Sequence, residues 1–71
     1  MKPELLRRTI LKTPFRPVRI RLDLGDPLLV THPENIGITN VLVLVSEGPE
    51  APYFFEPERV VAIEHPKGRK R

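Results

Sequence analysis

Three arginines close together in the chain, Arg16, Arg19 and Arg21, are the side chains best suited to binding chemistry. Because residues two apart on a β-strand project from the same face, Arg19 and Arg21 would point in one direction. Guanidinium groups bind phosphate oxygens, so this arginine row predicts a surface for the backbone of RNA or DNA. The alternative is that the arginines pair across strands with acidic side chains and form a solvated, salt-bridged face. The acids considered for that pairing are Glu47, Glu56, Glu58 and Glu64.

Residues 67–71 form a second basic cluster, which includes Arg69, Lys70 and Arg71. A run of like charges is typical of a solvated, disordered tail. Such a tail would bind any polyanion without sequence specificity, and together with the arginine row it defines the candidate nucleic-acid surface. The plainer alternative is a tail that only adds solubility.

Few other residues have the types and spacing that catalysis or metal binding requires. His32, Glu34, Glu64 and His65 could be ligands or an acid–base set, but both histidines precede proline, as at strand ends, and no metal-ligand spacing relates them. Ser46, the single serine, has no histidine near it in the sequence. The sequence also has no cysteine and no glycine-rich phosphate loop. We therefore predict a protein that is not an enzyme and that holds no metal or cofactor.

The charges are segregated along the chain. Residues 1–21 carry seven basic side chains against one acid, a net charge of +6, whereas residues 22–66 carry eight acids against Arg59 alone, a net charge of −7. The final basic cluster adds +4, which gives the total of +3. Faces of opposite sign could dock on one another or on a partner. This pattern favours a protein–protein adaptor or a homo-oligomer whose association depends on salt.

Length and composition limit the possible classes of protein. A chain of 71 residues without cysteine makes one small domain that has no disulfide to stabilise it, so oligomerisation is the expected support. The longest apolar run, residues 41–45, is far shorter than the roughly 20 residues of a membrane span. No apolar segment follows the basic N-terminus as in a secretory signal, so we expect a cytoplasmic protein. Eight arginines against four lysines, nine prolines and no glutamine are typical of a thermophilic or GC-rich bacterial source.

Local patterns predict one helix followed by short strands. Residues 3–12 have Leu6 and Ile10 on one apolar side and begin with Pro3, which suits a first helical turn. Alternation predicts a strand over residues 18–24, and shorter strands follow at 28–31 and 59–64. The apolar segment 41–45 is typical of a central strand covered on both faces. Residues 46–52 read as a loop.

The aromatic segment at residues 53–55 is the remaining strand and the best candidate for a partner contact. Strand alternation would bury Phe54 and expose Tyr53 and Phe55, or the reverse. We assign the contact to Tyr53 and Phe55, because exposed aromatics dominate the energetics of protein interfaces. Together these elements predict an α+β, mostly β domain over residues 1–66. In it an N-terminal helix precedes a four- to five-stranded antiparallel small barrel.

Two resemblances bear on this fold. The segment 14–22, the turn at 23–26, His32-Pro33-Glu34 and the segment 60–64 resemble a family of short uncharacterised bacterial proteins. The order of helix and strands is also similar to that of small barrels of the SH3 and Sm-like kind, among them the bacterial Sm-like RNA chaperones. In those chaperones a Tyr-Lys-His-Ala-Ile-type segment near the last strand helps to bind uridine-rich RNA. Here that place holds the acids Glu56 and Glu58, so the resemblance implies a barrel and assembly through strand edges but no such RNA site.

These observations favour a non-enzymatic protein–protein interaction or assembly module that forms homo-oligomers. The alternative function is RNA or DNA binding through the arginine row and the basic tail.

Overall fold

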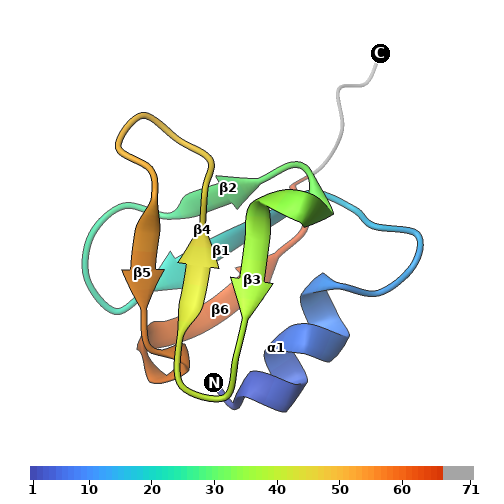
Figure 1. Ribbon diagram of the computed structural model, residues 1–71, viewed down its shortest axis with the longest axis horizontal. Helices are drawn as coiled ribbons and strands as arrows, with labels where there is room; N and C mark the ends of the chain where they lie inside the picture. Colours follow the sequence, from blue (N-terminus) through green and yellow to red (C-terminus); the bar gives the residue numbers. More distant parts are fainter. Residues whose placement is uncertain (67–71) are drawn as a thin grey trace.

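The computed structural model describes residues 1–66, which form one α-helix, six β-strands and two short 3-10 helices (Figure 1). In chain order the elements are α1 (Pro3–Ile10), β1 (Val18–Leu22), β2 (Leu28–Val30), η1 (Pro33–Asn35), β3 (Ile36–Ile38), β4 (Val43–Val45), β5 (Tyr53–Phe55), η2 (Pro57–Arg59) and β6 (Val60–Glu64). The predicted basic tail, with Arg69, Lys70 and Arg71, lies outside the described residues.

The strands form two three-stranded antiparallel sheets. One has the order β2-β1-β6 and the other the order β3-β4-β5. The sheet β3-β4-β5 lies in front of the other in Figure 1, and its strands cross those behind it at a steep angle. Among residues 1–66 no strand pairs across the two sheets, so the barrel is not closed by hydrogen bonds. The prediction of a mostly β, α+β domain is confirmed, although six strands replace the four or five expected.

The core lies between the inner faces of the two sheets, and α1 contributes to it. Val18, Ile20 and Val30 from one sheet meet Val43 and Val45 from the other, and all five are buried. No polar or charged side chain of residues 1–66 is buried. Folding therefore depends on apolar contacts in a chain too small to form a second core.

Helix α1 docks through the two residues that its sequence pattern predicts. Leu6 and Ile10 are fully buried, one turn apart, whereas Leu5 beside them is 45% exposed. The helix ends at Ile10 rather than at the predicted residue 12, since Leu11 already leaves the helical conformation and makes the last helical hydrogen bond, to Arg7. An isolated helix of eight residues would not be stable in water, so tertiary packing must hold it.

Strand β1 has the predicted alternation but is shorter than expected. It ends at Leu22 instead of residue 24, after the register with β6 shifts between Arg21 and Leu22, and the Asp23 amide makes one further hydrogen bond, to the Arg59 carbonyl at 2.9 Å. The turn that follows has Gly25 at φ +85°, a conformation that glycine adopts without steric cost.

The predicted central strand over residues 41–45 is wrong in its first half. Val41 and Leu42 lie in the turn between β3 and β4, and Val41 is 74% exposed. The Thr39 hydroxyl accepts hydrogen bonds from the amides of Val41 and Leu42 at 3.2 and 2.9 Å, which bends the chain into this turn. Apolar composition alone predicted a strand there, but these local hydrogen bonds make a hairpin instead.

We predict that Leu6 carries the docking of α1. Leu6→Ala should lower the free energy of unfolding by about 2–5 kcal/mol, because Leu6 is fully buried in the single core and its truncation leaves a cavity there. Leu5→Ala on the same helix is the matched control and should change it by less than about 0.5 kcal/mol. Urea titration followed by circular dichroism measures both values, and equal losses in the two variants would contradict this assignment.

Candidate interaction surfaces

Of the arginine row, Arg19 and Arg21 lie on one face of a strand, and Glu64 pairs with both. Arg19 and Arg21 lie on the outer face of β1, where Arg19 Nη1 is 3.3 Å from Glu64 Oε1 and Arg21 Nε is 2.8 Å from Glu64 Oε2. Their hydrogen bonds, that of Arg21 foremost, hold the pKa of Glu64 below its ordinary value, and the carboxylate raises the pKa of Arg21. Two guanidinium groups and one carboxylate leave this face with a net charge of +1.

Arg16, the third member of the row, is not part of strand β1. It lies in the segment between α1 and β1, is exposed, and makes no ion pair with any residue in the range 1–66. Of the four acids considered as partners, only Glu64 pairs with the arginine row. The predicted salt-bridged face therefore exists for Arg19 and Arg21.

A second ion-pair cluster lies at the end of the sheet β2-β1-β6 where β1 ends and β6 begins. Arg59 Nη1 is 2.9 Å from Asp23 Oδ1, and Arg59 Nε is 3.5 Å from Glu56 Oε1. These contacts connect the turn after β1 with η2, where the chain passes from one sheet to the other. Arg59 and its two acids all belong to residues 22–66, so of the basic side chains in residues 1–21 only Arg19 and Arg21 are paired with an acid of the later segment in this fold.

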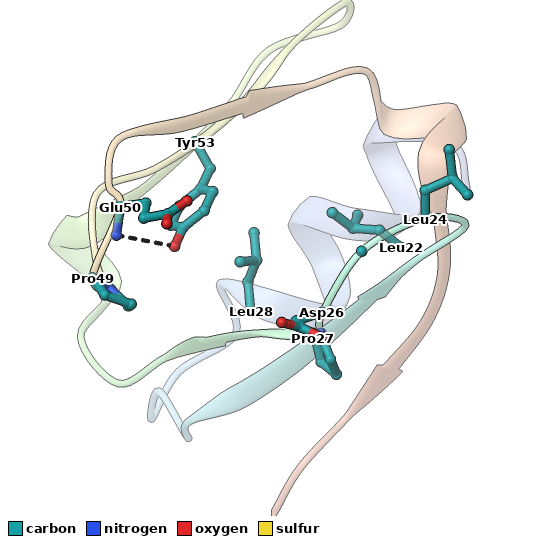
Figure 2. A pocket seen from close by; sticks show the side chains of 9 residues that line it. Leu22, Leu24, Asp26, Pro27, Leu28, Pro49, Glu50 and Tyr53 are labelled. Atoms are coloured by element: carbon teal, nitrogen blue, oxygen red, sulfur yellow. Dashed lines mark hydrogen bonds between the residues drawn. The ribbon is translucent and has the colours of Figure 1, made fainter.

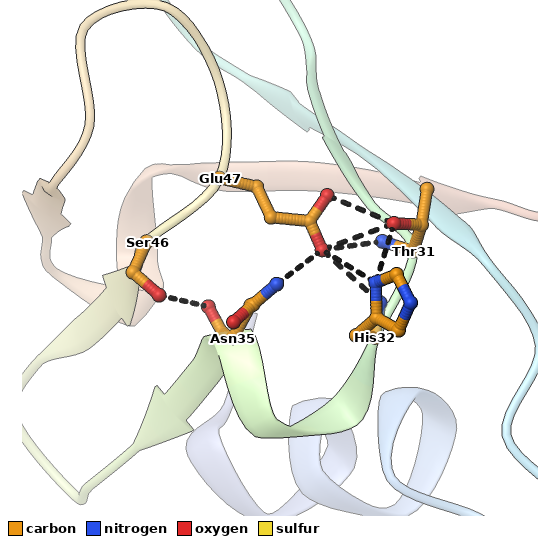
Figure 3. A network of polar contacts seen from close by, with 5 residues as sticks. All are labelled: Thr31, His32, Asn35, Ser46 and Glu47. Carbon is orange, nitrogen blue, oxygen red and sulfur yellow. Dashed lines mark hydrogen bonds and ion pairs between the residues drawn. The ribbon is translucent and has the colours of Figure 1, made fainter.

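Glu47 is the centre of the densest polar network of the described residues (Figure 3). Its Oε2 accepts hydrogen bonds from the Thr31 amide at 2.9 Å, the His32 amide at 3.1 Å and the Asn35 side-chain amide at 2.9 Å. The Thr31 hydroxyl donates to both carboxylate oxygens at 3.1 and 3.2 Å. The side chain is only 17% exposed, and these donors, Asn35 foremost, hold the pKa of the carboxyl below its ordinary value.

This network holds the chain in place and lacks the geometry of a nucleophile relay. In such a relay a hydroxyl and a carboxylate bind opposite nitrogens of one imidazole. Here the Thr31 hydroxyl lies 2.9 Å from His32 Nδ1, and Glu47 Oε2 lies 3.7 Å from the same nitrogen. The carboxylate instead fastens the β4–β5 loop to the segment between β2 and η1. The sequence does not predict this role, because no local pattern links Glu47 to Thr31, His32 and Asn35, which lie 12 to 16 positions earlier in the chain.

The four residues weighed as metal ligands or acid–base groups do not form one site. His32 follows β2, whereas His65 follows β6 and lies 3.2 Å, through Nδ1, from the Pro17 carbonyl. Glu64 is engaged by the arginines, and Glu34 is exposed in η1. Within residues 1–66 no three histidine or acidic side chains come close enough to hold a metal ion.

The aromatic strand β5 has the opposite phase to the one assigned. Phe55 is 6% exposed and lies in the core, Tyr53 is half-buried, and Phe54 is 62% exposed. Pairing with β4 sets this phase, since Tyr53 and Phe55 lie opposite the buried Val45 and Val43. The assignment of Phe55 as an exposed contact is therefore corrected, and Phe54 becomes the accessible aromatic.

Phe54 belongs to an apolar row that crosses the outer face of its sheet. The register places Gly37 of β3, Leu44 of β4 and Phe54 of β5 side by side, and paired residues project from the same face. None of the three is charged, and Leu44 is half-buried. In Figure 1 no helix or strand formed by residues 1–66 lies over this outer face. We call Gly37, Leu44 and Phe54 the apolar row.

A pocket with a volume of about 530 Å³ opens between the β1–β2 turn and the β4–β5 loop (Figure 2). Leu22, Leu28 and Tyr53 give it apolar walls, and Asp26 and Glu50 add two carboxylates. The Tyr53 hydroxyl accepts a hydrogen bond from the Glu50 amide at 3.3 Å, and both residues line the pocket. Its chemistry suits a partly apolar, cationic group.

Comparisons with known proteins leave this chain without an assigned relative. No family model matches it, and neither the curated proteins nor the solved structures contain a significant match. The resemblances to short bacterial proteins and to Sm-like and SH3-like barrels therefore stay predictions. Among the described helices, none has the length and apolar character needed to cross a bilayer.

We predict that Glu47 stabilises the fold as an anion. A carboxyl with a lowered pKa stabilises the folded state above its unfolded pKa, near 4.3, and loses that effect as the pH falls through the folded value. Glu47→Gln should lower Tm at pH 7 by roughly 4–8 °C, a loss of about 1 kcal/mol in a domain of this size. The difference from the unchanged protein should shrink below about pH 4.3.

Glu50→Gln is the matched control for that measurement, because Glu50 lies in the same loop and its carboxylate has no partner in the range 1–66. Thermal unfolding followed by circular dichroism across the pH range gives both curves. A Glu47→Gln difference that stays constant from pH 7 to pH 3 would contradict the role of the charge.

Proposed function

We propose that this protein is a non-enzymatic protein-interaction and assembly module that forms homo-oligomers. The observation that carries the proposal is the apolar row, in which Phe54 is 62% exposed although it lies on a paired strand. Exposed aromatic side chains on rigid elements are typical anchors of protein interfaces. A domain of this size without disulfides also gains stability when it buries such a surface against a partner.

The ion pairs support apolar rather than electrostatic association. Arg19, Arg21 and Arg59 each form an ion pair with a carboxylate of the same chain, so their attraction to a charged second molecule is weakened. The segregation of charge in the sequence predicted association driven by opposite faces. We instead propose that contact through the apolar row provides most of the binding free energy.

We also propose that the scaffold is a small barrel of the SH3 or Sm-like kind that is open along one side. The two sheets share a single core, and the short helices η1 and η2 carry the chain from one sheet to the other. The opening lies between β5 and the β1–β2 turn, where the pocket is found. This arrangement leaves the outer face of β3-β4-β5 available for a partner.

The proposal predicts self-association that resists salt. Sedimentation velocity from low to high micromolar concentration should show a shift from monomer to a larger species. Because burial of apolar surface is not screened by ions, the shift should persist in molar salt, where contacts between exposed charges are lost. A protein that stays monomeric at every concentration and salt level would overturn the homo-oligomer.

Nucleic-acid binding is the second candidate function, and three cations favour it. Lys2, Lys12 and Arg16 are exposed and make no ion pair with the residues of the range 1–66. Lys12 and Arg16 lie in the segment that leads into β1, close in sequence to Arg19 and Arg21. On this alternative, Glu64 limits binding because it occupies both strand arginines.

Glu64→Gln tests that alternative, because it frees the guanidinium groups of Arg19 and Arg21 without removing a basic side chain. If this face binds nucleic acid, the variant should bind a single-stranded oligonucleotide more tightly. The slope of the logarithm of its binding constant against the logarithm of the salt concentration should become more negative by about 0.7 for each added phosphate contact. Glu58→Gln removes the same charge from an exposed site in η2 and controls for net charge. Equal binding by both variants, or none in low salt, would contradict nucleic-acid binding through the arginine row.

A further inference from the structure

We propose that the partner of the apolar row is a second copy of this chain, packed face to face so that each Phe54 covers the Gly37 of the other copy. This inference rests on the assembly function proposed above and names the surface and the partner. It follows from the shape of the row, which combines a projecting side chain, a central leucine and an open position.

The apolar row has a projection at one end and a gap at the other. Phe54 projects from β5 with most of its side chain exposed, and Leu44 stands in the middle on β4. Gly37 on β3 has no side chain, and a Cβ placed there would meet no atom within 4 Å. The gap is therefore open to the surface rather than filled by a neighbouring part of the same chain.

A two-fold axis along β4 makes this row complementary to itself. Neighbouring strands lie about 4.8 Å apart, so Gly37 and Phe54 are about 10 Å apart with Leu44 midway. Rotation by 180° about an axis parallel to β4, between two facing sheets, exchanges the two ends and leaves the centre in place. Each Phe54 then stands over the partner's Gly37 while the two Leu44 side chains meet. Such a contact is isologous, as in most homodimers.

Sheet spacing and charge both permit this contact. Packed sheets lie about 10 Å apart, a gap that a phenylalanine ring can fill when the opposite residue is glycine. The apolar row carries no charge, so two copies do not repel each other there. The acid closest to Phe54 in the sequence is Glu56, which follows β5, and Arg59 Nε lies 3.5 Å from its carboxylate. Arg59 is shared with Asp23, so this cluster has a net charge of −1, but the carboxylate of Glu56 is paired with a guanidinium rather than isolated.

The surroundings of the sheet favour contact through its face. Helix α1 lies beside β3, and Arg7 donates a hydrogen bond to the Ile38 carbonyl at 3.4 Å and to Asn40 Oδ1 at 3.0 Å. This arrangement covers part of the β3 edge. The exposed Val41 and Leu42 in the adjoining turn extend the apolar surface beyond the row. The apolar row and the adjoining turn offer a contact surface that is small beside the roughly 1,200–2,000 Å² buried in a standard interface. We therefore expect a dimer that dissociates in the micromolar range.

Two substitutions test the contact from its two sides. Phe54→Ala removes the projection, and Gly37→Val fills the gap. Neither should harm the monomer, since Phe54 is exposed, valine favours strands, and Gly37 has space for a side chain and no positive φ. Each variant should raise the dimer Kd at least about tenfold, and Tm of the monomer verifies that the fold is retained. Leu29→Ser, an exposed leucine on the other sheet, should leave Kd unchanged.

A mixture of the two variants gives the decisive measurement. In the mixed dimer, Phe54 of the Gly37→Val chain still meets Gly37 of the Phe54→Ala chain. At the other end, the alanine at position 54 of one chain faces the valine at position 37 of the other. There the larger side chain comes from position 37 instead of position 54, so the two side chains still fit. Sedimentation equilibrium should therefore show tighter association in the mixture than in either variant alone.

The outcomes separate this inference from the proposed function. The inference is overturned if the Phe54→Ala and Gly37→Val variants associate as tightly as the unchanged protein does. It is also overturned if Leu29→Ser weakens the dimer instead. In either case the protein assembles through another surface. If the variants weaken association but the mixture recovers none, pairing of Phe54 with Gly37 is also overturned. A protein that is always monomeric would overturn both proposals.

Discussion

The structure depends on one constraint: two small sheets must bury their inner faces against each other, because the chain has nothing else with which to form a core. No disulfide is possible, and no polar side chain of residues 1–66 is buried. Strand alternation supplies Val18 and Ile20 to one side of the core and Val43 and Val45 to the other. Helix α1 closes the core with Leu6 and Ile10. Every other feature follows from which residues remain outside.

Polar contacts at the rim determine how the chain turns between the sheets. Glu47 collects donors from the segment after β2 and from Asn35, which holds the β4–β5 loop against the entrance to β3. Arg59 joins the turn after β1 to η2, and Arg7 joins α1 to the end of β3. These bonds are formed between residues far apart in the sequence. They select one arrangement of sheets that apolar burial alone would leave undetermined.

The same alternation that builds the core makes the two outer faces chemically different. On the sheet β2-β1-β6, Arg19 and Arg21 share Glu64, so charged side chains lie on the same outer face as the exposed Leu29. On the sheet β3-β4-β5, the apolar row is uncharged and exposes Phe54. Charged groups let water solvate the first face better than the uncharged apolar row, which is why the second face is the surface on which we base assembly.

By itself, the sequence determined the elements whose signal is local. The spacing of Leu6 and Ile10 predicted the buried side of α1, and the alternation after Val18 placed Arg19 and Arg21 on one outer face, because helical and strand periods act over a few residues. Only the tertiary structure decided which phase β5 adopts, since Phe54 and Phe55 are equally apolar and pairing with β4 selects the buried one. It also decided that Val41 lies in a turn and that Glu47 binds residues across the fold. Glu64 rather than another acid meets the arginines for the same reason: strand register brings together residues 45 positions apart, and no local pattern records that distance.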